Sequence, residues 1–185
     1  MTEATIVGRD QAYQTVDVYR KYIPGMEDCW MSHTAQLIGT RESRRIVGQH
    51  VITKQEIINE SKFEDSIGYG SFFIDIHNCT GIGMDTETIT PRKGFKYQIP
   101  FRALIPKKIK NLTVAGRCIS STHTALGSLR VMPQCMLEGE ACGCAASQTI
   151  DKNINISGIS IQTLQSDLRS HGAIITNDDI VQNHS

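Results

Sequence analysis

The spacing of apolar residues predicts amphipathic helices near both ends of the chain. Between residues 3 and 22 apolar side chains recur every three or four positions with charges between them, and Pro24 and Gly25 end the pattern. Residues 161–170 show the same spacing, and Gly172 stops it at a position typical of a helix C-terminus. The first helix shows no residues that indicate chemistry, so we expect it to serve in packing.

Alternating apolar and polar residues predict two strands in the middle of the chain, at residues 71–77 and 95–99. Residues 81–94 would connect them as in a hairpin. Asp75 and His77 stand two residues apart on the first strand and would point to one face. They form either an acid–base pair that meets a substrate or a surface pair on a half-exposed sheet.

A basic run and a helix start lie ahead of these strands. Arg41, Arg44 and Arg45 fall within five residues, before an apolar run. They form either a solvated rim or an anion site, because arginine offers forked donors suited to phosphate or carboxylate. Thr53 and Glu56 have the spacing of a capping box, which predicts a short helix.

The segment from residue 111 to 150 has the most specific pattern. An apolar run at 112–115 ends on Gly116 and Arg117, as a buried parallel strand ends at a turn, and a polar loop with His123 follows. Gly127 and Ser128 predict a second turn that opens a helix over residues 131–150. One face of this helix carries small side chains that we expect to pack closely: Cys135, Gly139, Cys142, Gly143, Ala146 and Ile150. A strand, a turn and a helix N-terminus together present backbone N–H groups to an electron-rich ligand.

This segment resembles the C-terminal cofactor segment of FAD-dependent oxidoreductases related to the heterodisulfide reductase A subunit. The matching letters are VAGRC and ISSTH, then GSLRVMP, CM and GEA followed by a further glycine. The stretches GTRESRRIVG (39–48), PFRALIPKKIKNL (100–112) and LQSDLRSHGA (164–173) fit the same family. The resemblance therefore extends over most of the chain.

The resemblance implies a mixed α/β fold. The C-terminal strand and helix of a Rossmann-type FAD domain would adjoin an α+β cap that shapes the substrate pocket. The expected divisions are a helix packed on the cap (1–25), the cap and substrate region (26–106), the C-terminal part of the FAD domain (107–150), and a linker with a C-terminal helix (151–185).

The resemblance also implies roles for individual residues in contacting the flavin and a small-molecule substrate. His123 and Arg44 would be catalytic, and Arg41 and His77 would bind substrate. The cofactor contacts would be Gly116, Arg117, Gly127, Ser128, Arg130, Val131 and Met132. The backbone donors of the last group, with Arg130, would stabilise the negative charge that builds at the pyrimidine end of the flavin on reduction.

One element of an FAD site is missing from the printed sequence. FAD-binding Rossmann domains hold the ADP half of the cofactor with a G-x-G-x-x-G turn, and no such motif occurs here. We therefore expect either the C-terminal part of a longer flavoprotein or a non-catalytic subunit or interaction module. In the second case a partner chain would supply the nucleotide half of the site.

Composition narrows the remaining possibilities. Among 185 residues, 19 basic and 19 acidic side chains cancel, which disfavours nucleic acid as a partner, and no apolar run approaches the roughly 18 residues that span a membrane. The six cysteines lack the spacing of iron–sulfur ligands, since only Cys142 and Cys144 are close. We expect reduced thiols that pack in a cytoplasmic protein, and no metal site.

Overall fold

A computed structural model describes residues 2–77, 85, 88–90 and 92–182, and the chain forms two compact units, Met1–Arg41 and Glu42–Ser185. The expected connection at 81–94 lies largely outside the described residues. The elements in chain order are α1 (Thr2–Tyr22), α2 (Lys54–Ile58), β1 (Ser66–Gly70), β2 (Tyr97–Pro100), η1 (Phe101–Leu104), α3 (His123–Leu129), α4 (Met132–Lys152), η2 (Ile156–Gly158), α5 (Ile161–Ser170) and α6 (Asn177–Gln182).

The first unit consists of α1 and the chain that follows it. The helix spans the residues that its apolar spacing predicts, and none of them is buried within this structure. Beyond the helix, Arg20 Nε donates to the Cys29 carbonyl at 2.7 Å and ties the returning chain to the last turn. The packing of this helix on a cap stays a prediction.

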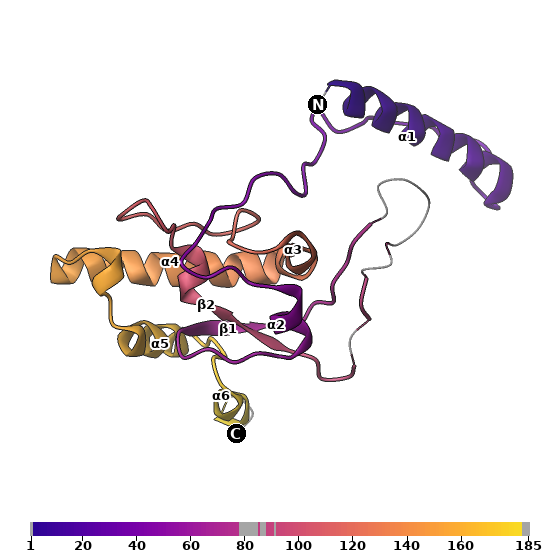
Figure 1. The fold of residues 1–185 in the computed structure, drawn as a ribbon. Helices are drawn as coiled ribbons and strands as arrows, with labels where there is room; N and C mark the ends of the chain where they lie inside the picture. The colour runs from indigo at the N-terminus through magenta and orange to yellow at the C-terminus, as the bar shows by residue number, and fades with distance from the viewer. Residues whose placement is uncertain (1, 78–84, 86–87, 91, 183–185) are drawn as a thin grey trace. The chain divides into compact units, whose positions relative to one another are not determined.

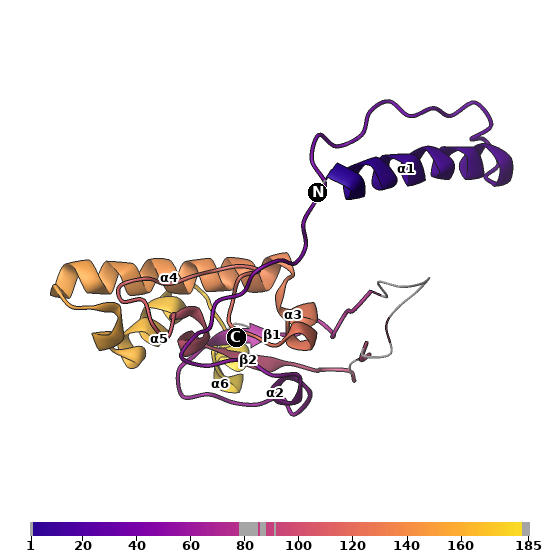
Figure 2. The same ribbon diagram turned by 45° about the horizontal axis from the view of Figure 1, so that its top comes forward.

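The second unit is built on a two-stranded antiparallel sheet. Strands β1 and β2 pair with Tyr69 opposite Gln98 and Gly70 opposite Tyr97. Helices α4 and α5 pack against β1 and against each other, and both views of the ribbon show α4 running alongside the two-stranded sheet (Figures 1 and 2). The helices thus cover a small sheet that has no third strand among the described residues.

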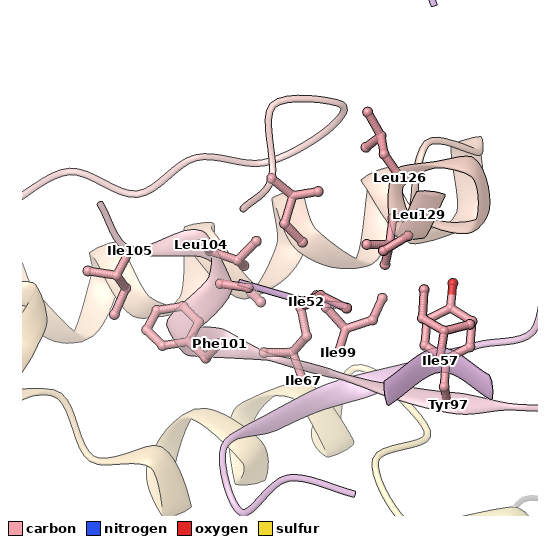
Figure 3. Close-up of a cluster of buried hydrophobic side chains, with 14 of the residues drawn as sticks. Ile52, Ile57, Ile67, Tyr97, Ile99, Phe101, Leu104, Ile105, Leu126 and Leu129 are labelled. Carbon is pink, nitrogen blue, oxygen red and sulfur yellow. The ribbon is translucent and has the colours of Figure 1, made fainter. Parts of the chain in front are cut away.

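Apolar side chains from strands β1 and β2, η1 and α3 form much of the core of this unit (Figure 3). Ile67 of β1, Ile99 of β2 and Leu129 of α3 are all fully buried. Tyr97 is buried as well, and its hydroxyl lies 2.7 Å from Ser128 Oγ in α3. This contact fixes α3, and with it the start of α4, against the two-stranded sheet.

Several local predictions are confirmed. Thr53 and Glu56 form the reciprocal capping box of α2. Strand β2 lies within the alternating stretch that ends at Pro100, and α4 and α5 cover the predicted helical segments. The mixed α/β class is also confirmed. In each case the signal depends on residues within a few positions of one another.

Two predicted strands are wrong. Residues 112–115 belong to no strand, and Val114 N–H donates to the Leu104 carbonyl of η1. Residues 71–77 form no strand and carry only isolated bridge positions, at Ile74 and His77. There Ile74, Asp75 and Ile76 are all buried, so the alternating pattern does not correspond to a buried face and an exposed face.

The prediction for the α3–α4 region is wrong in two details. Gly127 and Ser128 lie inside α3 and form no turn, so the break between the helices falls instead at Arg130 and Val131. The small-residue face of α4 is also not the packed one, because Gly139 and Gly143 are exposed with open space around them. The buried face carries Gln134, Glu138, Ala141, Ala145 and Gln148.

Candidate active site

The junction between α3 and α4 places several polar residues at one position in the fold. Thr122 caps α3 by accepting the Ala125 N–H at 3.4 Å, which puts His123 at the first position of the helix. Arg130 ends α3, and Val131 is the N-cap of α4. The first N–H groups of α4 have no partners within the helix, since its hydrogen bonds begin one turn later.

Glu42 connects three basic side chains near this junction. Its Oε1 accepts a hydrogen bond from Arg45 Nη1 at 2.6 Å and lies 2.6 Å from His123 Nδ1. Its Oε2 accepts from Arg130 Nη1 at 3.3 Å. The Glu42 side chain is only 19% exposed, so these partners largely replace the water around its charge.

Arg130 links this group to a second carboxylate and a second histidine. Its Nη2 donates to the Asp75 carbonyl at 2.7 Å and lies 3.9 Å from Asp75 Oδ2. On the other side of the carboxylate, His77 Nε2 lies 3.3 Å from Asp75 Oδ1. The Arg130 side chain is 10% exposed, so a nearly buried positive charge stands between two carboxylates, each paired with a histidine.

The two histidines can exchange protons with a ligand. Both are more than half exposed, although the carboxylates that they contact are largely buried. Because His123 Nδ1 faces Glu42, its Nε2 is the ring atom that can reach a ligand. A carboxylate that holds one ring nitrogen fixes the ring orientation, as general acid–base catalysis requires.

The Gly116 turn forms a second polar feature, against the buried face of α4. Gly116 has φ +94°, a left-handed conformation that glycine adopts without strain, and its N–H donates to Glu138 Oε2 at 2.6 Å. Glu138 is fully buried, and its Oε1 has no hydrogen-bond partner among the described residues. Burial raises the pKa of Glu138 to about 8, although the Gly116 N–H opposes this change.

Two cysteines flank this carboxyl on α4. Burial raises the pKa of the Cys135 and Cys142 thiols, and the charge of Glu138 acts in the same direction. Cys142 Sγ donates to the Val114 carbonyl at 3.5 Å. Both groups are therefore thiols rather than reactive thiolates at neutral pH. Within the described part of the chain, no three His, Cys, Asp or Glu side chains are arranged to hold a metal ion.

The structure brings together some of the predicted site residues and separates others. His123, Arg130 and His77 meet in one network. Arg44 is exposed on the surface of the second unit, and Arg41 belongs to the first unit.

The predicted cofactor residues of α3, Gly127 and Ser128, pack against neighbouring backbone. A Cβ on Gly127 would lie 2.9 Å from the Asp75 carbonyl oxygen, so the absent side chain admits the neighbouring backbone. Ser128 is buried and donates to the Phe72 carbonyl. Among the predicted cofactor residues, Arg117 and Met132 are exposed, and Gly116 and Val131 beside them are half-buried.

Sequence reasoning missed Glu42. It stands among the arginines of the basic run, and its signal was a single carboxylate between cations that need a partner. The interpretation of that run considered only the three arginines. Of these, Arg45 pairs with Glu42.

Comparison with known proteins gives one match. A family model described as FAD dependent oxidoreductase matches residues 1–168. Neither the curated proteins nor the solved structures contain a match to the chain. None of the helices among the described residues has the length and apolar character needed to cross a membrane.

Proposed function

The chain belongs to the family of FAD-dependent oxidoreductases, and from this we propose that its second unit contacts the flavin end of FAD at the α3–α4 junction. The observation that supports this proposal is the Glu42–Arg130–Asp75 network. Arg130 directly precedes Val131, the N-cap of α4. In this arrangement Val131 and Met132 supply backbone contacts, and His123 stands at the substrate side of the flavin.

The residues at the junction fit the flavin end of the cofactor. Reduction places negative charge on the pyrimidine part of the flavin, and the partial positive charge of a helix N-terminus stabilises it. Arg130 immediately precedes this N-terminus and is held by two carboxylates. The Gly116 turn has open space where a side chain would stand, so its backbone can approach a ligand closely.

The same residues do not fit the ADP half. That half needs a glycine-rich turn between a parallel strand and a helix. The printed sequence has no G-x-G-x-x-G, and the sheet of the described residues is a two-stranded antiparallel one. We infer that the nucleotide half is bound by polypeptide other than residues 42–185.

In this proposal FAD, when bound, supplies the hydride or electron transfer. His123 gives or takes a proton through Nε2, while Glu42 at Nδ1 holds the ring in place. Arg130 keeps positive charge beside the reacting centre in a largely dry position. His77, held by Asp75, is the second proton-carrying group and contacts the substrate.

The lack of a glycine-rich turn favours a second candidate function. The chain is then a non-catalytic subunit or interaction module that completes a flavin site on a partner chain. Co-purification of a protein with G-x-G-x-x-G supports this role, and flavin-dependent turnover by the isolated chain contradicts it. A closer relation to the heterodisulfide reductase A subunit and a cytoplasmic location remain proposals.

Titration of the purified chain with riboflavin, FMN and FAD tests the flavin contact. If only the flavin end is bound, the three dissociation constants agree within about tenfold. Both Arg130→Met and His123→Asn are expected to weaken riboflavin binding. The matched control is His171→Asn, because His171 is also exposed and pairs with a carboxylate, Glu140, at 3.2 Å.

Two outcomes would contradict this assignment. One is a chain that binds no flavin, with circular dichroism showing that it is folded. The other is riboflavin binding that both site variants leave unchanged. His123 is more than half exposed, so its replacement separates loss of binding from loss of folding. A much tighter affinity for FAD than for riboflavin would place the nucleotide half on this chain as well.

A further inference from the structure

A cleft of about 890 Å³ opens beside the N-terminus of α4. It lies between this helix, the chain at the ends of β1 and β2, and residues 172–180. Its walls include three half-buried aromatic side chains, Tyr69, Phe72 and Phe95. Leu137 of α4 and Ile174 add apolar surface. The volume lies in the range of small-molecule sites, which are mostly apolar and aromatic with a few placed polar groups.

One polar group in this cleft lacks a partner. Gln134 is 4% exposed, and its Oε1 has no hydrogen-bond partner among the described residues. Burial raises the pKa of the Tyr97 hydroxyl, and a hydrogen bond from the Gln134 side chain opposes this rise, as a donated N–H does. The amide nitrogen is therefore engaged, and the buried oxygen remains as an acceptor. A buried acceptor without a donor is costly, so a bound donor at this point would be stabilised.

Charge further restricts the ligand. Lys96 is the single charged residue lining the cleft among those the structure describes, and its Nζ lies 5.1 Å from the centre of the Tyr69 ring. The N-terminus of α4, at Val131 and Met132, adds partial positive charge to the same wall. A cationic ligand is therefore disfavoured, and a neutral or anionic one is accepted.

We propose that this cleft binds part of the substrate, a flat aromatic group that is neutral or anionic and carries a hydroxyl or amide donor for Gln134. This inference rests on the proposed flavin contact, since Val131 and Met132 belong to both surfaces. The aromatic walls suit a planar ring system, because aromatic side chains interact with rings in stacked or edge-to-face geometry. The buried acceptor selects the donor and so orients the ring.

Binding of 2-naphthol, measured by calorimetry and by NMR shift changes without added flavin, tests the cleft directly. The two-ring probe carries one hydroxyl donor, and 2-methoxynaphthalene has the same rings without it. We expect 2-naphthol to bind about tenfold more tightly, and Gln134→Leu to abolish this preference. Cyclohexanol, which is not flat, is expected to bind at least tenfold more weakly than 2-naphthol.

Two tryptophan variants locate the probe. Met132→Trp fills the cleft from its rim, where the methionine is 79% exposed, and is expected to block 2-naphthol. Met136→Trp is the matched control, because Met136 is 73% exposed one turn further along α4 and does not line the cleft. Equal binding to both variants would overturn the assignment, as would a 2-naphthol preference that survives Gln134→Leu.

Lumiflavin, which has the flavin rings without the ribityl chain, separates this inference from the flavin contact. Binding of 2-naphthol and lumiflavin together supports a substrate cleft beside a flavin site. Mutually exclusive binding in the cleft would show that the rings of the cofactor occupy it, and would overturn the substrate assignment. Binding of 2-naphthol by a chain that ignores every flavin supports the cleft and contradicts the flavin contact alone.

Discussion

Replacement of Glu138 by glutamine gives a sharp test of the buried site below the Gly116 turn. The carboxyl is fully buried, one oxygen accepts the Gly116 N–H, and burial raises its pKa from an ordinary 4.5 to about 8. Glutamine keeps an acceptor oxygen for Gly116 but never becomes charged. We therefore expect Glu138→Gln to stabilise the protein at alkaline pH and to have little effect at acid pH.

The pH window follows from the two pKa values of Glu138. Below pH 4.5 the carboxyl is protonated in both the folded and the unfolded chain, so the contribution of Glu138 to stability is most favourable there. As the pH rises toward about 8, the unfolded chain loses its proton and the folded chain keeps it, so folding becomes less favourable. At about 1.4 kcal/mol for each pH unit in this window the loss is limited to roughly 5 kcal/mol. Relaxation around the charge reduces the expected loss to about 2–4 kcal/mol.

Urea unfolding between about pH 5 and pH 8 measures this difference. We expect the wild type and Glu138→Gln to have nearly equal free energies of unfolding at the acid end and to diverge by about 2–4 kcal/mol at the alkaline end. Glu140→Gln is the control, because Glu140 lies on the same helix, is 39% exposed and pairs with His171. Parallel pH curves for the wild type and Glu138→Gln would refute the reasoning.

Three further changes test other parts of the structure. A Cβ on Gly127 would lie 2.9 Å from a backbone oxygen, so Gly127→Ala is expected to lower the free energy of unfolding by about 1–3 kcal/mol. A Cβ on Gly139 would meet open space, so Gly139→Ala is expected to raise the free energy of unfolding by about 0.5–1 kcal/mol. Thr53→Ala removes the capping box of α2 and is expected to cost about 1 kcal/mol in thermal unfolding. Arg130→Met leaves Glu42 without the most buried of its three basic partners and is expected to cost about 2 kcal/mol, part of which Glu42→Gln restores. Strictly additive effects in the double variant would contradict the pairing of Arg130 with Glu42.

The sequence contained part of the candidate site. His123 and Arg130 stand in the segment with the most specific pattern, and His77 stands beside an acid two residues away. Their association could not be predicted, because Glu42 joins His123 and Arg130 across separations of 81 and 88 residues. A partner so distant in the chain leaves no local spacing to detect.

The sequence by itself determined where α1, α2, α4 and α5 lie. The spacing of apolar side chains located α1, α4 and α5, and the residues at 53 and 56 determined the start of α2. These features depend on contacts between residues three or four apart, which an isolated segment already contains. The class of mixed α/β fold follows from the same signals together with the stretch that forms β2.

Only the tertiary structure decided which face of each element is buried. Glycines and alanines on one side of α4 indicated close packing, yet the buried side carries Gln134 and Glu138. That choice depends on the Gly116 turn, whose N–H meets Glu138, and on Tyr97, which hydrogen-bonds Gln134. Residues 112–115 remained outside any strand for the same reason. A strand requires a neighbouring strand, and burial requires a covering element, so neither is encoded in the segment alone.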